Sequence, residues 1–328
     1  MTSYNNNNTN NFEIWKNSEK YGGSKIYFIP YKYEELWSIE EKLWNAEFTH
    51  GMFTKHWHVS IYIVMAYIAG VYSLKKWMED RKAFDLRLPL FFWNVGLSIF
   101  STCGAWRFGH EFFYVLLNRG FQDSICLSFS PAEPVAFWAM CFALSKIAEF
   151  GDTVFLLLRK RPLIFLHWFH HAVVLIYSWH SATELTAAGR WFIQLNYMVH
   201  SVMYAYYAAA CIGIRAPKWI SMSVTAMQTT QANCSELIKR LKMTKSVDIF
   251  KCQSTTPSLR GRDRRGSGWH SATELTAAGR WFIQLNYMVH SVMYAYYAAA
   301  CIGIRAPKWI SMSVTAMQTT QASCSKLN

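Results

Sequence analysis

The chain has 328 residues, of which 52% are hydrophobic and only 16% are charged, and its formal net charge is +13. Soluble globular domains carry about 25% charged residues, so this composition argues against an ordinary soluble protein and excludes disorder for most of the chain. The basic residues lie between long apolar runs, whereas a soluble protein would carry them over the surface of a folded domain. The charge therefore gives no support to a nucleic-acid-binding protein.

Long apolar runs predict helices that cross a membrane. Residues 57–74 and 88–106 contain no Asp, Glu, Lys or Arg over 18 and 19 positions, close to the length that a spanning helix needs. Further apolar runs follow at residues 134–158, 162–177, 191–214 and 219–235. Singly, the shorter runs are also compatible with buried helices of a soluble protein. Six in succession predict an all-α, polytopic, multi-pass membrane protein.

Basic clusters follow the first, third and fifth of these runs, as expected for cytoplasmic loops. The N-terminus is therefore expected on the lumenal or extracellular side, and residues 1–55 are predicted to be a polar lumenal segment. Asn7 lies in the pattern Asn-Asn-Thr, which is a candidate glycosylation site on that side of the membrane.

The sequence contains an exact internal repeat, because residues 179–232 recur unchanged as residues 269–322. Structural repeats normally diverge and run in several copies, so one identical copy indicates a recent duplication or an assembly error. Residues 236–268 between the copies are rich in Lys, Arg, Ser, Thr and Gly, which predicts a disordered linker. The predicted organisation is a membrane domain at 56–234, a basic linker at 235–268, and the repeat with a short tail at 269–328.

Three histidines, His167, His170 and His171, lie inside the fourth run at spacings that place them on one helical face. Ionisable groups are costly within a membrane and usually line a polar cavity. The alternative is a set of hydrogen bonds between helices, which one histidine alone would satisfy. Three within five residues favour a functional site.

Three further polar stripes have helical spacing. They comprise Lys146, Glu149 and Asp152; Asn196, His200, Tyr204 and Tyr207; and Thr225, Gln228 and Gln231. Four stripes on four spans predict one cavity within the membrane, in which Glu149 and Asp152 orient the histidine rings. The chemistry stays open between a metal site, as in a membrane lipid desaturase or hydroxylase, and an imidazole nucleophile that accepts an acyl group.

In order and spacing, these motifs resemble those of the ELO family of very-long-chain fatty acid elongases. The resemblance covers about residues 56–234, and residues 155–178 are most similar to the branch acting on long-chain saturated and monounsaturated acyl groups. It implies a helical barrel of seven spans in the endoplasmic reticulum membrane. Such enzymes condense acyl-CoA with malonyl-CoA to 3-ketoacyl-CoA, CoA and carbon dioxide, without a cofactor or metal ion.

The resemblance also implies residue roles. His170 would accept the acyl group, His200 would assist it, and His167 and His171 would shape the site. The residues expected to bind the substrates are Lys146, Glu149, Asp152, Asn196, Tyr204, Tyr207, Gln228 and Gln231, with Arg159, Lys160 and Arg161 at the CoA phosphates. Expected partners are the lipid bilayer, acyl-CoA, malonyl-CoA and the reductases and dehydratase of the elongation cycle, with no nucleic acid.

The sequence departs from the family after Gln231, where the seventh span is expected to be missing and the linker and repeat follow instead. The repeated run at residues 281–304 would enter from the same side and could fill that position. The alternative is an inactive, truncated and duplicated gene product.

Overall fold

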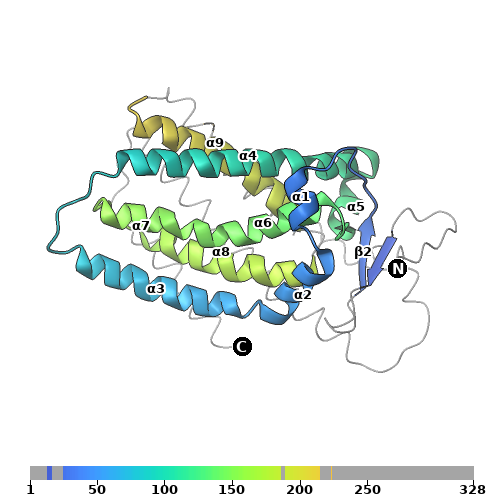
Figure 1. The fold of residues 1–328 in the computed structure, drawn as a ribbon, viewed down its shortest axis with the longest axis horizontal. Coiled ribbons are helices and arrows are strands. Elements are labelled where there is room, and N and C mark those ends of the chain that lie inside the picture. Colours follow the sequence, from blue (N-terminus) through green and yellow to red (C-terminus); the bar gives the residue numbers. More distant parts are fainter. Residues whose placement is uncertain (1–12, 17–24, 186–188, 215–222, 224–328) are drawn as a thin grey trace.

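The computed structural model describes residues 13–16, 25–185, 189–214 and 223. Long helices run side by side along its longest axis (Figure 1). Their bounds are α3 Val59–Trp77, α4 Arg87–Asn118, α6 Pro134–Ala148, α7 Phe150–Leu158, α8 Phe165–Glu184 and α9 Gly189–Cys211. By length and composition, α3 and α4 can each cross a membrane.

Helix α4 has 32 residues and continues well beyond the apolar run at 88–106. Arg107 and Glu111 end that run in the sequence, but both side chains are buried in ion pairs. A charge that is paired and hydrogen-bonded can remain within a packed helix. The charged residues that mark the end of the apolar pattern therefore do not mark the end of the helix.

The run at 134–158 forms two helices, α6 and α7, that meet at Glu149. Pro134 lies in the first turn of α6, where proline is tolerated because no backbone donor is needed there. Glu149 has φ −58° and ψ −16°, which are nearly helical angles. The two helices therefore continue in almost one line, and the junction carries a carboxylate.

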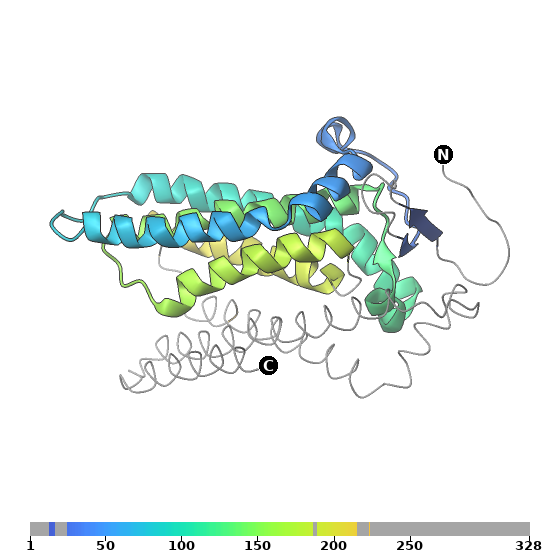
Figure 2. The same cartoon turned by 90° about the horizontal axis from the view of Figure 1, so that it is seen from below.

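The helices pack in a bundle in which α4 lies along α9, while α8 contacts α2, α3 and α6 (Figure 2). Phe108, Phe142 and Tyr197 belong to one buried apolar cluster, and Tyr67 and Leu175 belong to another. Tyr197 lies against Gly104, where an added Cβ would approach its ring to 2.4 Å. A side chain at this glycine would push α9 away from α4.

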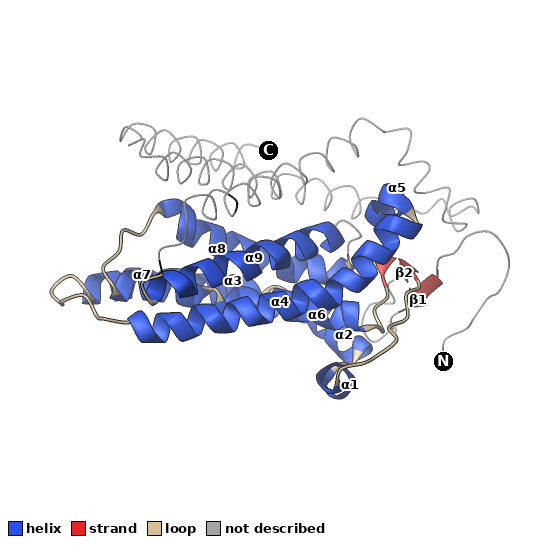
Figure 3. Ribbon diagram, turned by 90° about the horizontal axis from the view of Figure 1, so that it is seen from above, coloured by secondary structure: helices blue, strands red, loops and turns tan. Residues whose placement is uncertain are grey.

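A small sheet at one end of the bundle corrects the all-α prediction to a mostly helical fold (Figure 3). Its strands are β1 Glu13–Lys16, β2 Lys25–Ile29 and β3 Ser128–Phe129. Strand β2 pairs antiparallel to β1 and parallel to β3. Strands of two to five residues are too short for a reliable alternating pattern. Pairing between β2 and the distant β3 is a tertiary feature.

The described part of segment 1–55 packs on the bundle. It contains α1 Ser38–Leu43 and α2 Ala46–His56. Glu40 accepts hydrogen bonds of 2.7 Å from Nε of Arg107 and from the indole of Trp138. Burial raises the pKa of Glu40, but these donors and the Trp37 backbone N–H outweigh burial and lower it overall. An ionised Glu40 therefore fastens α1 to α4 and α6.

A second buried ion pair joins α9 to the sheet end of α4. Arg190 donates hydrogen bonds of 3.0 and 2.8 Å to the two carboxylate oxygens of Glu111. It also donates to the backbone carbonyls of Ser124, Leu127 and Ser128, around the end of α5 Gly120–Cys126. This hydrogen bonding compensates for removing the guanidinium from water.

Candidate active site

A buried polar cluster lies where α6, α7 and α9 meet. The ammonium of Lys146 donates a hydrogen bond of 2.6 Å to Oε1 of Glu149 and one of 3.0 Å to Oδ1 of Asn196. These three residues are only 2%, 4% and 8% exposed. Buried charges need such partners. The polar residues that the sequence placed on helical faces therefore form a connected hydrogen-bond network here.

The network determines which nitrogen of His200 carries the proton. Lysine can only donate, so the amide oxygen of Asn196 faces Lys146 and its Nδ2 faces Nε2 of His200, 3.3 Å away. In neutral His200, Nε2 is then the acceptor and Nδ1 carries the proton. This Nδ1 lies 3.6 Å from Oε1 of Glu149. Nε2 is therefore the nitrogen that carries the lone pair in the neutral ring.

Glu149 lies between histidines of two helices. Its second oxygen, Oε2, is 3.9 Å from Nδ1 of His171 on α8. The ring of His171 lies 4.6 Å from that of His167 and 5.6 Å from that of His170, between centroids. The Nε2 atom of His167 is buried without a hydrogen-bond partner within the described part of the chain. One carboxylate thus links the three-histidine motif to His200.

Asp152 has different partners from those expected, because indole and phenol groups hold it. Trp93 of α4 donates a hydrogen bond of 2.7 Å to Oδ1, and Tyr204 of α9 donates one of 2.7 Å to Oδ2. The Trp93 ring packs so closely on Gly151 that an added Cβ would lie 2.5 Å from it. Trp93 was missed in the sequence because a tryptophan in an apolar run carries no polar spacing signal.

A narrow space lies beside this cluster and is too small in this structure to hold a water molecule. It is lined by Leu97, Phe100, Ser101, Phe142, Ser145, Lys146, Glu149, Asn196, Tyr197, His200 and Tyr204. Ser101, in the middle of α4, is a further buried polar residue of this wall. The polar groups converge on a space that is otherwise apolar and aromatic, as in many small-molecule sites.

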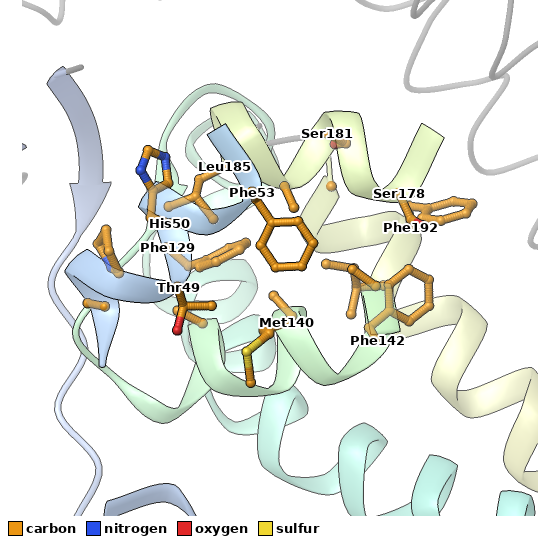
Figure 4. Close-up of a pocket in the computed structure, with 18 of the residues that line it drawn as sticks. Thr49, His50, Phe53, Phe129, Met140, Phe142, Ser178, Ser181, Leu185 and Phe192 are labelled. Carbon is orange, nitrogen blue, oxygen red and sulfur yellow. The ribbon is translucent and has the colours of Figure 1, made fainter. Parts of the chain in front are cut away.

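A second, larger cavity of about 650 Å³ lies nearer the sheet end of the bundle (Figure 4). Its wall is mostly apolar. Phe53, Phe129, Met140 and Phe192 project around it, with Thr49, Ser178 and Ser181 among its few polar groups. The lining comes from α2, α6, α8 and α9 together with the segment around β3.

Two helices show the order of the two spaces along the bundle. On α6, Ala136 and Ala139 line the apolar cavity, whereas Lys146 lines the polar space. Helix α9 has the same chain order, with Phe192 at the apolar cavity and His200 at the polar space. The cavities therefore follow one another along the axis, with the polar one farther from the sheet.

Helix α8 passes the two regions in the reverse chain order, and a third, basic region lies before its start. His170 and His171 are near its start, while Ser178 and Ser181 line the apolar cavity near its end. The end opposite the sheet is basic. Lys160 and Arg161 are exposed there and Arg159 is partly buried, just before the start of α8. Nζ of Lys160 donates a hydrogen bond of 3.0 Å to the carbonyl of Glu79, which joins this loop to the one after α3.

Some predicted site residues lie apart from the cluster. Tyr207 is 44% exposed, and its ring lies beside that of Tyr206. Gln228, Gln231 and the candidate glycosylation site Asn7 lie outside the described residues, as do the sixth predicted span, the linker and the repeat. Within the described residues, no three His, Cys, Asp or Glu side chains are grouped as ligands for a metal ion.

Curated proteins similar to this chain are named as fatty acid elongases. A Caenorhabditis elegans protein named "Putative fatty acid elongase 4" is 48% identical over 191 residues, which cover 58% of this chain and 66% of that protein. The Drosophila melanogaster "Very long chain fatty acid elongase 6" is 45% identical over 185 residues, covering 54% and 58%. The mouse protein of the same name is 41% identical over 192 residues, covering 58% and 72%. The chain thus spans less than two thirds of the length of the first two relatives.

A family match extends over most of the sequence. The family described as "ELO: GNS1/SUR4 family" matches residues 52–260 and, separately, residues 267–327. The first match contains the polar cluster, the polar space and most of the lining of the apolar cavity, and the second contains the repeated copy. The chain belongs to the ELO: GNS1/SUR4 family and is a polytopic membrane protein.

Proposed function

We propose that this protein is a fatty acid elongase that condenses a long-chain acyl-CoA with malonyl-CoA to form 3-ketoacyl-CoA, CoA and carbon dioxide. Family membership and the names of the relatives support this function over a metal-dependent desaturase or hydroxylase. The proposed reaction needs no resident cofactor, since both substrates already carry activated thioesters.

The observation that carries the proposal is the order of three environments along the bundle. A basic end, a polar cluster and an apolar cavity follow one another. An acyl-CoA has the same order, with phosphates, a thioester and a hydrocarbon chain. Guanidinium and ammonium groups suit phosphates, and a cavity lined mostly by apolar side chains suits a hydrocarbon chain.

In the proposed first step, Nε2 of a neutral imidazole, on His170 or His200, attacks the thioester carbonyl. The carbon–sulfur bond breaks, CoA leaves as a thiolate, and an acyl-imidazolium forms, which keeps its Nδ1 proton. In the second step, loss of carbon dioxide from malonyl-CoA gives an enolate that attacks this acyl group. The carbon–nitrogen bond breaks and the imidazole is regenerated. Lys146 would stabilise the enolate oxygen.

The hydrogen-bond network supports a specific role for Asn196. Its amide N–H donates a hydrogen bond to Nε2 of His200. This nitrogen can therefore take up an acyl group or a proton only after the hydrogen bond breaks. Glu149, beside Nδ1 of both His200 and His171, would stabilise positive charge on either ring. His167 would shape the same site.

The proposed setting is the endoplasmic reticulum membrane, with six spans before the linker and a lumenal N-terminus. The basic loops around Arg81 and Lys160 would then face the cytoplasm. In that setting the reductases and dehydratase that complete the elongation cycle would receive the 3-ketoacyl-CoA.

Trapping tests the proposal. The purified full-length chain is incubated with palmitoyl-CoA alone, and its peptides are mapped by mass spectrometry. We expect a palmitoyl adduct on His170 or His200 that disappears when malonyl-CoA is added and 3-ketoacyl-CoA is released. A folded protein that yields neither adduct nor product would overturn the proposal. If the purified protein instead contains stoichiometric iron, and activity is lost when the iron is removed, the result would support the metal-dependent alternative.

A further inference from the structure

The two cavities have one lining residue in common. Phe142, on α6, lines both the apolar cavity and the narrow polar space, and no other described residue lines both. Its ring therefore stands between the two spaces, at the edge of the apolar cavity seen in Figure 4.

The contacts of Phe142 differ from those of an ordinary core phenylalanine. On the polar side, the ammonium of Lys146 lies 4.1 Å from its ring centroid. The rings of Phe192 and Tyr197 meet it edge-on, with centroids 5.6 and 5.5 Å away. The side chain is 2% exposed, yet it borders the apolar cavity on one side and the narrow polar space on the other. A well-packed core ring has neighbouring atoms all around it.

We propose that the ring of Phe142 is a movable partition that a long acyl chain must displace in order to enter the apolar cavity. This inference rests on the proposed function and identifies a specificity-determining residue for it. With the thioester at the histidines, only a chain long enough to pass Phe142 can occupy the larger cavity. A short chain would remain on the polar side.

The neighbouring residues leave room for this movement. Ala139 and Ala143, close to Phe142 on α6, line the apolar cavity with small side chains. The edge-on aromatic contacts are individually weak, whereas the buried contact with Lys146 is stronger. The ring can leave these contacts only when a hydrocarbon chain replaces enough of the buried surface. Passage then favours long chains, because only they gain the burial that offsets the displacement.

Binding of two non-reactive ligands tests the partition. The full-length chain in lipid nanodiscs is titrated with the thioethers S-hexadecyl-CoA and S-hexyl-CoA. In Phe142→Trp, a larger ring should obstruct the passage and weaken binding of the hexadecyl ligand about tenfold, since overpacking has a cost of that order. Binding of the hexyl ligand should change less than about twofold.

A smaller side chain gives a second, independent measurement. Phe142→Leu should speed the association of S-hexadecyl-CoA severalfold and leave that of S-hexyl-CoA unchanged. The matched control is Phe112→Leu, because Phe112 is also buried and packs on Trp191 but lines neither cavity. The control should leave the ratio of the two affinities at the wild-type value.

The outcomes separate the partition from the function. The partition is wrong, whatever the turnover of the enzyme, if both Phe142 variants change the binding of the two ligands by the same factor. It is also wrong if Phe112→Leu shifts the ratio of the two affinities as the Phe142 variants do. If the ratio shifts as expected but the wild-type protein forms no 3-ketoacyl-CoA, the partition holds and the proposed reaction is wrong. A folded wild-type protein that binds neither thioether would overturn both.

Discussion

The indole of Trp93 donates a hydrogen bond of 2.7 Å to a carboxylate oxygen of Asp152. This bond connects α4 to α7 across the centre of the bundle, and Tyr204 connects the same carboxylate to α9. Both oxygens of Asp152 are therefore held by donors from other helices. Since α7 begins directly after Glu149, this arrangement also supports the junction that carries the Glu149 carboxylate.

Replacing Trp93 with phenylalanine tests this connection. We expect Trp93→Phe to lower the free energy of unfolding by about 1–3 kcal/mol, the range for leaving a buried acceptor without its donor. The rate of condensation should fall as well. Thermal unfolding in detergent and product formation measure the two effects. Trp106→Phe on the same helix, where the indole is 65% exposed, should change neither.

The pair of Lys146 and Glu149 offers a double-mutant cycle. Glu149→Gln and Lys146→Met each leave one buried charge without its partner, so each should destabilise the protein by about 3–5 kcal/mol. The double variant should recover much of that stability, because no uncompensated charge remains. Activity should stay lost, because Glu149 no longer stands beside His171 and His200. A double variant with wild-type turnover would show that the pair is structural only.

The ion pair of Arg190 and Glu111 is fully buried, at 0% side-chain exposure for both residues. Glu111→Gln should therefore reduce stability by about 3–5 kcal/mol. The exposed pair of Arg87 and Asp85, at 75% and 78% exposure, is the control. Asp85→Asn should change stability by about 1 kcal/mol or less. Equal effects in thermal unfolding would contradict the role of Arg190 as a buried link.

His50 should make stability dependent on pH. Its Nε2 donates a hydrogen bond of 2.9 Å to the carbonyl of Thr183, which joins α2 to α8. Burial lowers the pKa of His50, and this hydrogen bond only partly opposes the shift. The unfolded chain then takes up the proton first, so stability is full above the unfolded pKa of about 6.5 and falls as the pH drops below it.

The matched variants isolate this effect. The unfolding temperature of the wild type should fall as the pH is lowered from about 7 to 5, and His50→Gln should remove part of that decrease. His56→Gln, on the exposed side of the same helix, should leave the pH dependence as it is. An unchanged slope in His50→Gln would assign the acid sensitivity to other groups.

The sequence by itself determined the helical class, the helix spacing of the polar residues and the family resemblance. These properties follow from local periodicity, because Lys146, Glu149 and Asp152 share a helical face wherever the helix packs. Asn196, His200 and Tyr204 likewise share a face of α9. The exact repeat is also a property of the sequence alone.

Only the tertiary structure decided which of these faces meet and what completes them. It paired Glu149 with histidines of two other helices and gave Asp152 to Trp93 and Tyr204. It also separated Tyr207 from the cluster and placed Phe142 between two cavities. Partners from distant helices, and the volume left between them, depend on how the helices pack, and helical periodicity carries no information about that packing.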